Sequence, residues 1–285
     1  MLDWTPWRPL LACCSDRGLS AAGLYRVRRA GRDDIDYIGQ TGLALRARLH
    51  MLQGIYRAAM PYRDPHTAAP ALWAQRQISG EDYEASTLAV AGEVPHRKAQ
   101  EAVAIAIYRQ EHGRSPTSSF GRMPLGYRMS SANNSRLVQA GRRFRGGPCD
   151  ASEECHLPSL CPVGALDADT ESDAWCGHSW SPWEPLAGAG PRLTRTASGL
   201  YRIRGRCGVL YVGEGAIASR LHAHAAKVRR VSLPQDVVFA ANEPLECSWV
   251  KNNEWRAHQR EELETDLIAA FAMALGSPPR AQFLG

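Results

Sequence analysis

Tyrosine, arginine and glutamate residues occur twice in the same order along this 285-residue chain. In chain order, the two sets are Tyr25, Tyr37, Arg48 and Glu101, followed by Tyr201, Tyr211, Arg220 and Glu264. An arginine presents a planar fork of donors that fits two phosphate oxygens, and Mg²⁺ needs only one or two protein carboxylates. Hydrolysis of a phosphodiester requires an activated water and neutralisation of the charge that develops on phosphate. The two sets are therefore candidates for phosphodiester chemistry.

Each set begins on a pair of short strands that the sequence repeats. Gly23–Val27 precedes the tripeptide Tyr37–Gly39, and Gly199–Ile203 precedes the tripeptide Tyr211–Gly213. Short runs of this composition, separated by a few polar or glycine residues, are typical of β-hairpins. A repeat of this kind indicates that a whole structural unit is present twice.

Each set also ends with the same spacing. In both halves a glutamate lies 12 residues before a glycine and 19 before a phenylalanine: Glu101, Gly113 and Phe120, then Glu264, Gly276 and Phe283. Both glycines are placed as C-terminal stops of a helix that carries the glutamate.

The hydrophobic pattern predicts a mixed α/β (α+β) fold with two small domains, each a short antiparallel sheet flanked by helices. The expected strands cover residues 23–27, 35–39, 199–203 and 209–213. Apolar residues at helical spacing predict helices over residues 43–52, 71–78, 98–111, 216–228 and 260–275. We expect a first domain over 1–145, a loop-rich insert over 146–191 and a second domain over 192–285.

The insert is rich in Pro, Gly, Ser and Asp and contains four cysteines: Cys149, Cys155, Cys161 and Cys176. His156 and His178 lie beside two of them. These side chains could hold a structural Zn²⁺, which would order a segment that has little core of its own. The Cys-x2-Cys pair of common zinc modules is absent. Free thiols in a loosely ordered insert are therefore the other interpretation.

The paired tyrosine strands, followed by a helix with an arginine and a helix with a glutamate, resemble the GIY-YIG nucleases. The resemblance covers both halves and preserves the order of the motifs. It implies a small α/β domain that cleaves phosphodiesters of nucleic acids with a divalent metal ion.

By this resemblance, Glu264 and Glu101 would be ligands of Mg²⁺ or Mn²⁺. Arg220 and Arg48 would clamp a phosphate, with Arg46 as the alternative to Arg48 if the first helix begins earlier. The strand tyrosines, Tyr201, Tyr211, Tyr25 and Tyr37, would position or activate water. Free tyrosine has a pKa of about 10, so such a role needs a nearby metal ion or cation.

His224 follows Arg220 by four residues, on the same helix face, and matches a histidine that many members of this family have at that place. It could relay a proton. The first half departs from this pattern, because Leu52 is the residue four after Arg48 and only His50 is nearby.

The ends of the two repeats depart from the family as well. Ser119 and Gln282 stand where the family often has an asparagine. The second repeat therefore has the fuller set of residues, and we expect it to be the active one.

The formal net charge is +5, and arginine supplies nearly all the positive charge, since Lys98, Lys227 and Lys251 are the only lysines. The densest basic cluster includes Arg142, Arg143 and Arg145 among glycines. This cluster indicates either a loop that contacts nucleic-acid phosphates or a solvated linker.

The leading hypothesis is a divalent-metal-dependent DNA endonuclease of restriction, defence or repair type, with double-stranded DNA as the favoured substrate; cleavage of RNA or single-stranded DNA stays open, because no residue pattern reads a base edge or a 2′-hydroxyl. The alternative is a catalytically inactive nucleic-acid-binding protein with a structural zinc module. The duplication favours a monomer with an internal pseudo-dimer, or a homodimer. No apolar run approaches the roughly 20 residues of a membrane helix, and the N-terminus lacks a signal-peptide layout, so we expect a cytoplasmic protein.

Overall fold

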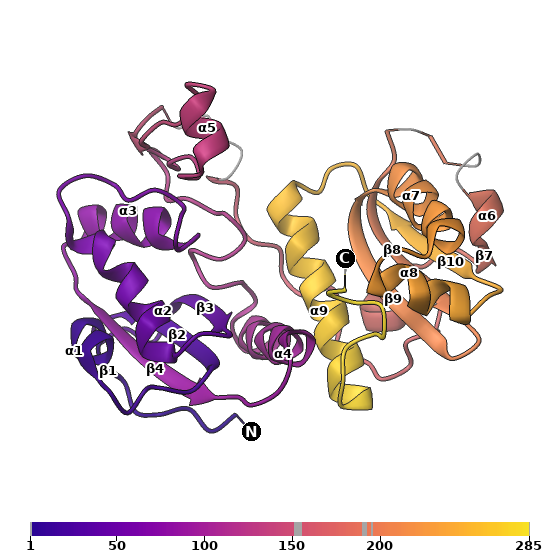
Figure 1. Cartoon of the computed structure of the whole chain (residues 1–285), viewed down its shortest axis with the longest axis horizontal. Coiled ribbons are helices and arrows are strands. Elements are labelled where there is room, and N and C mark those ends of the chain that lie inside the picture. The colour runs from indigo at the N-terminus through magenta and orange to yellow at the C-terminus, as the bar shows by residue number, and fades with distance from the viewer. Residues whose placement is uncertain (1, 151–155, 190–192, 195, 285) are drawn as a thin grey trace. The chain divides into compact units, whose positions relative to one another are not determined.

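The structure is a computed structural model of the chain, and it describes residues 2–150, 156–189, 193–194 and 196–284. The chain divides into two compact units. Unit 1 comprises residues 1–92 and 115–158, and unit 2 comprises residues 93–114 and 159–285. Each unit contains one of the two tyrosine hairpins that the sequence repeats (Figure 1).

Unit 1 is built on a four-stranded antiparallel sheet of order β1-β4-β2-β3. Its strands are β1 (Arg8–Pro9), β2 (Gly23–Arg29), β3 (Ile35–Thr41) and β4 (Tyr83–Ala89). Its main helices are α1 (Leu10–Ser15), α2 (Leu45–His50), the 3₁₀ helix η1 (Met51–Tyr56) and α3 (Ala69–Ser79). A smaller part holds β5 (Tyr127–Arg128), α5 (Ser135–Gln139) and β6 (Gly147–Pro148).

The core of unit 1 forms between its helices and the face of β2 that carries Tyr25 and Val27, both fully buried. Leu49 of α2 and Leu72 of α3 pack into this core. The expected helix over 43–52 begins later and continues as η1, because Leu52 and Ile55 are both buried and hold the chain in a helical path after α2 ends.

Unit 2 contains a second four-stranded antiparallel sheet, of order β7-β10-β8-β9. Its strands are β7 (Glu184–Pro185), β8 (Ser198–Gly205), β9 (Gly208–Ala216) and β10 (Glu246–Lys251). Its helices are α4 (Val94–His112), the 3₁₀ helix η3 (Trp175–Gly177), α6 (Leu186–Ala189), α7 (Ile217–Arg230), α8 (Pro234–Ala241) and α9 (Ala257–Leu275).

The helices of unit 2 cover both faces of its sheet (Figure 1). Leu221 of α7 and Phe239 of α8 pack with Tyr201 on one face, whereas Leu263 and Leu267 of α9 pack with Leu200 on the other. Alternate residues of one strand therefore point into two separate cores. The predicted α+β class, with antiparallel sheets flanked by helices, is confirmed.

The two sheets share details that a chance resemblance would not reproduce. Their strand orders correspond, and both tyrosine hairpins change register at the same place, after Val27 and after Ile203. Phe120 and Phe283, which end the two repeats, both have positive φ, at 57° and 64°. Such values are uncommon for a bulky residue, so their recurrence supports the duplication.

The repeat extends beyond the elements that the sequence analysis assigned to it. Residues 4–10 read WTPWRPL and residues 180–186 read WSPWEPL, and each segment supplies the edge strand of its sheet, β1 or β7. Trp7 lies 4.5 Å from the guanidinium of Arg26, and Trp183 lies 4.5 Å from that of Arg202. The second repeat thus includes β7 and α6. Both elements lie within residues 146–191, which the sequence predicts as an insert.

Helix α4 corresponds in sequence to α9, and both end at a glycine with positive φ, Gly113 at 67° and Gly276 at 74°. The sequence analysis assigned α4 to the first domain. Its contacts place it in unit 2, where Val103 and Ala106 pack in one core with Leu263 and Leu267 of α9. The helix also begins earlier than expected, because Pro95 is accommodated in its first turn.

Candidate functional site

In unit 2, the glycine of the second strand motif allows the two tyrosines to lie together. Tyr201 of β8 pairs with Gly213 of β9, and a side chain at Gly213 would collide with the Tyr201 ring. The rings of Tyr201 and Tyr211 are stacked with 6.0 Å between centroids. In unit 1, Gly39 has the same relation to Tyr25, since an added Cβ would lie 2.6 Å from the tyrosine oxygen.

His224 of α7 packs against both tyrosines of unit 2. Its Nε2 lies 3.1 Å from the Tyr201 hydroxyl, and its ring lies 4.7 Å from that of Tyr211. Burial, aided by the charges of Lys227 and Arg220, lowers the pKa of His224 to about 3. The imidazole is therefore neutral at pH 7. Its buried Nδ1 has no hydrogen-bond partner among the described residues.

Arg220 and Glu264 line the same pocket as Tyr211 and His224, in a cavity of about 340 Å³. Neither side chain forms a hydrogen bond or ion pair with another residue that the structure describes. Burial, followed by the negative charge of Glu214, raises the pKa of Glu264 to about 8, against the opposing effect of Arg220. A carboxylate that is disfavoured in this way gains most from a cation placed beside it.

The end of the second repeat closes this pocket. The Gln282 side chain is buried, and its Oε1 accepts a hydrogen bond of 3.1 Å from the backbone N–H of Val212, next to Tyr211. The amide at position 282 therefore braces the tyrosine strand while it lines the pocket. In unit 1 the Oγ of Ser119 is buried without a partner among the described residues.

Lys227 and Gln235 also line the pocket and were missed by the sequence analysis. Lys227 lies seven residues after Arg220 and three after His224, so all three side chains share one face of α7. This spacing could have identified it. Its ammonium group donates to the Gln235 side chain, which holds a second positive charge at the pocket wall.

Unit 1 contains a comparable arrangement with a different histidine. The Tyr25 hydroxyl lies 2.7 Å from Nε2 of His66, and the ring of His66 lies 5.4 Å from that of Tyr37. Burial lowers the pKa of His66 well below its usual value, so the ring is neutral. Its Nδ1 accepts the N–H of Ala68 at 3.2 Å, which leaves the ring proton on Nε2, directed at Tyr25.

The histidine that contacts the tyrosines of unit 1 is not His50, the one nearest to Arg48 in sequence. That side chain is exposed and lines a different pocket, and Leu52 is buried in the core. His66 comes instead from the loop before α3.

Arg48, and not Arg46, is the counterpart of Arg220. The backbone N–H of Leu45 donates to Ala21 at 2.8 Å, and that of Ile217 donates to Ala197 at 2.9 Å. Each arginine is the third residue after this common hydrogen bond. The Arg48 guanidinium also donates through Nε to the Tyr25 oxygen, at 3.3 Å.

Glu101 lies on α4 in unit 2, whereas Tyr25, Tyr37 and Arg48 lie in unit 1. Its pairing with those three residues stays a prediction.

The cysteines of the expected insert do not form a single cluster in the described part of the chain. Cys149 belongs to unit 1, Cys161 and Cys176 belong to unit 2, and Cys155 lies outside the described residues. Burial raises the pKa of Cys176 to about 11, so this side chain is a neutral thiol packed among aromatic residues. No three described His, Cys, Asp or Glu side chains lie close enough to hold a metal ion. Zinc binding stays a prediction.

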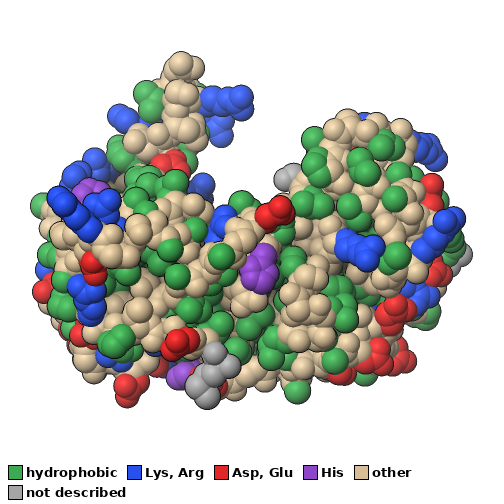
Figure 2. Space-filling model, turned by 60° about the horizontal axis from the view of Figure 1, so that its bottom comes forward, with side chains coloured by type: hydrophobic (Ala, Val, Ile, Leu, Met, Phe, Trp, Pro, Cys, Tyr) green, Lys and Arg blue, Asp and Glu red, His purple; other side chains and the backbone are tan. Residues whose placement is uncertain are grey.

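Two of the three predicted nucleic-acid-binding arginines stack on one aromatic ring in unit 1. The guanidinium groups of Arg143 and Arg145 lie 5.3 Å and 4.5 Å from the Tyr62 ring, and all three arginines are exposed. Figure 2 shows Lys and Arg side chains at the surface of the part of unit 1 that holds α5. DNA binding by these arginines stays a prediction.

No family model, curated protein or solved structure matches this chain. Among the described helices, none is both long enough and apolar enough to span a membrane.

Proposed function

We propose that the protein is a divalent-metal-dependent endonuclease that hydrolyses phosphodiester bonds of DNA, with its catalytic centre in unit 2. One observation carries the proposal. The Arg220 guanidinium and the Glu264 carboxyl group, neither with a hydrogen bond or ion pair among the described residues, line one pocket with Tyr211 and His224. An anion-binding group and a cation-binding group at one cavity are what a phosphodiester and its metal ion require.

Glu264 is the residue that would hold the metal ion. Its carboxylate has no competing ion pair among the described residues, and Glu214 and Glu261 add negative charge around it. A bound Mg²⁺ or Mn²⁺ supplies Lewis acidity at the phosphate and lowers the pKa of water. These properties fit a hard divalent cation bound mainly by water and substrate oxygens.

Arg220 and Lys227 supply positive charge on the helix wall of the pocket. The planar guanidinium can donate to two phosphate oxygens as negative charge develops on them, and the ammonium acts as a second charge. Gln282 contributes an amide from the segment after α9. These groups orient the phosphate and stabilise its transition state.

Tyr211 is suited to positioning a water molecule, and His224 is suited to orienting the tyrosine pair. Burial raises the pKa of both Tyr201 and Tyr211, so both are neutral phenols at pH 7. A neutral phenol can accept a hydrogen bond from the attacking water and hold it in line with the phosphate. His224 is neutral, and its Nε2 is held against the Tyr201 hydroxyl, so it orients the tyrosine pair at the pocket.

A plasmid-cleavage assay with Mg²⁺ or Mn²⁺ tests this function. We expect Glu264→Gln, which keeps the shape but removes the charge, to abolish cleavage by the intact chain. The matched control is Glu254→Gln, an exposed glutamate of the same unit that is outside the pocket. Cleavage by Glu264→Gln at the wild-type rate would contradict the assignment. DNA binding without cleavage under any divalent ion would favour the inactive binding protein.

Unit 1 supplies a second candidate centre for the same reaction. There His66 and Arg48 both direct N–H groups at the Tyr25 oxygen, and two donors stabilise negative charge on a phenolic oxygen. A Glu264→Gln protein that still nicks one strand, and loses this activity with Arg48→Ala, would assign cleavage to unit 1 as well.

A further inference from the structure

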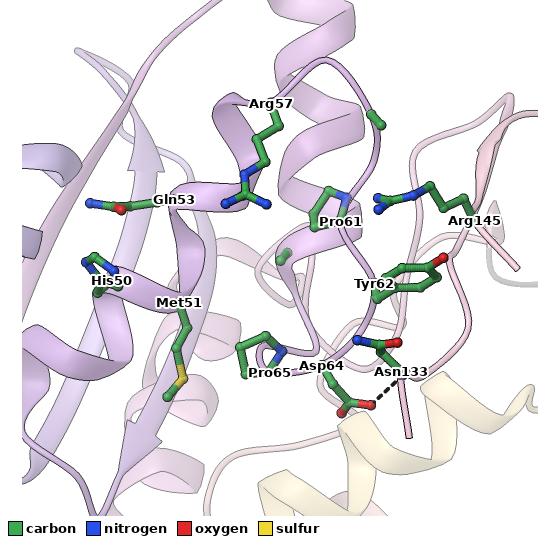
Figure 3. Close-up of a pocket in the computed structure, with 13 residues that line it drawn as sticks. His50, Met51, Gln53, Arg57, Pro61, Tyr62, Asp64, Pro65, Asn133 and Arg145 are labelled. Atoms are coloured by element: carbon green, nitrogen blue, oxygen red, sulfur yellow. Dashed lines mark hydrogen bonds between the residues drawn. The ribbon is translucent and has the colours of Figure 1, made fainter. Parts of the chain in front are cut away.

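Unit 1 contains a cavity of about 510 Å³ that the proposed reaction does not use (Figure 3). Its volume lies in the range of about 300–1,000 Å³ that is usual for small-molecule sites. The lining residues come from the end of α2, from η1 and the loop that follows it, and from the segments around Asn133 and Arg145.

One wall of the cavity is flat and aromatic. Arg145 donates to the backbone oxygen of Met60 at 2.7 Å, which fixes its guanidinium 4.5 Å from the Tyr62 ring. Met51, Pro61 and Pro65 provide apolar surface around this wall. Aromatic rings and guanidinium planes are the surfaces on which single nucleobases stack.

The polar groups of the cavity match the remaining parts of a nucleotide. The Arg57 side chain has no hydrogen bond or ion pair with another described residue, and Figure 3 shows the Arg57 and Arg145 guanidinium groups on either side of Pro61. Such groups can hold a phosphate. Asn133 accepts a hydrogen bond from Arg143 through Oδ1, at 3.1 Å, so its NH₂ group is available to a base edge.

The cavity adjoins the predicted phosphate-binding arginine of unit 1. Arg48 donates to the backbone oxygen of Pro65 at 2.7 Å and contacts the sulfur of Met51 at 3.7 Å, and both residues line the cavity. A DNA strand whose phosphate meets Arg48 would therefore lie beside two of the residues that line the cavity.

We propose that this cavity binds one nucleotide displaced from the base stack of DNA, with its base against Tyr62 and Arg145 and its phosphate on Arg57. The inference rests on the proposed function for the nature of the ligand, and it makes distorted or unpaired DNA the preferred substrate. Unstacking costs least free energy for an unpaired nucleotide. A cavity that binds an unstacked nucleotide therefore selects DNA with an unpaired nucleotide over regular duplex DNA.

The test measures binding of the full chain to a labelled short duplex and to the same duplex with one unpaired nucleotide, without divalent ions. We expect wild type to bind the second DNA about tenfold more tightly, in line with the usual contribution of one stacked base. Tyr62→Leu should abolish the preference and leave duplex affinity nearly unchanged, and Tyr62→Phe should keep it. Arg57→Ala should reduce it, whereas the exposed neighbour Arg63→Ala should not.

Thermal unfolding of each variant separates loss of binding from loss of fold. Equal affinity of wild type for the two DNAs, or an equal loss for both with Tyr62→Leu, would overturn the inference. Competition by a deoxynucleoside monophosphate without a preference for unpaired DNA would assign the cavity to free nucleotides and also overturn it. If the inference fails but the protein still cleaves plasmid DNA, the proposed endonuclease function stands. If the protein neither cleaves nor binds DNA, the proposed endonuclease function is refuted.

Discussion

The Arg109 guanidinium of α4 donates to both carboxylate oxygens of Asp266 in α9, at 2.8 and 2.9 Å. Both side chains are almost fully buried, and Glu262 lies 3.6 Å from the same guanidinium. This ion pair joins the two helices that carry Glu101 and Glu264. The helix that carries Glu264, the candidate metal ligand of unit 2, is thus anchored by a helix that belongs, in sequence, to the other repeat.

Replacing Arg109 with methionine should destabilise the protein by about 3–5 kcal/mol, because it leaves two buried carboxylates without their cation. Urea unfolding measures the change. Arg32→Met is the comparison, since the pair of Arg32 with Glu81 is exposed and should contribute less than about 1 kcal/mol. Similar losses for the two variants would contradict the structural role of the Arg109 pair.

Metal binding at Glu264 should depend on pH. Because its pKa is raised to about 8, the carboxyl is protonated in the metal-free protein at neutral pH and must lose this proton to bind a cation. The Mn²⁺ affinity, measured by calorimetry, should rise up to about tenfold per pH unit from pH 6 to 8 and level off above. Glu264→Gln should lose this binding, and an affinity that does not change over this range would refute the assignment.

The same pKa predicts how the metal-free protein responds to pH. A carboxyl whose pKa is raised on folding stabilises the fold below its unfolded pKa, near 4.5, and this contribution is lost as the pH rises toward 8. The free energy of unfolding should therefore fall between pH 5 and 8. Glu264→Gln should fall less steeply over the same range; identical slopes for the two proteins would argue against a raised pKa.

His66→Leu should lower the free energy of unfolding by about 1–3 kcal/mol, because the Tyr25 hydroxyl and the Ala68 N–H lose a buried partner. Chemical denaturation checks this value. His50→Leu replaces an exposed histidine of the same unit and should change stability by less than about 0.5 kcal/mol. A neutral effect of His66→Leu would mean that the imidazole contributes nothing to the tyrosine site.

Gly213→Ala should destabilise unit 2, since the new methyl group collides with the Tyr201 ring. A cost of about 1–3 kcal/mol is usual for overpacking of this kind. In a Tyr201→Leu background the collision with that ring is relieved, while the close approach of 2.8 Å to the Tyr211 ring stays, so the same substitution should cost less but not nothing. Equal costs in the two backgrounds, measured by thermal unfolding, would rule out the collision as the cause.

The sequence predicted what depends on local pattern. The tyrosine hairpins and the helix stops at Gly113 and Gly276 followed from short-range spacing, and the structure has them at those places. The repeated WxPWxPL segments are also a short-range pattern. Residues 180–186 directly follow a stretch rich in Pro, Gly, Ser and Asp, so they were predicted as part of the insert.

Long-range contacts could not be predicted in this way. His66 lies 41 residues from Tyr25, and nothing in its own neighbourhood marks it as a partner of that tyrosine. The buried contact of Arg109 with Asp266 joins residues 157 apart. The cavity beside Tyr62 brings η1 together with residues 133 and 145. Each depends on how distant segments pack, which periodicity does not encode.

In each half an imidazole contacts the first tyrosine of the hairpin, Tyr25 or Tyr201, but it comes from a different segment of the chain. In unit 2 it projects from α7, and in unit 1 it comes from the loop before α3. A hybrid in which α7 replaced α2 and η1 would direct two imidazoles at Tyr25, and the reverse exchange would leave Tyr201 with none. The duplicated halves are therefore not interchangeable modules at the tyrosine site, even though their backbones still correspond.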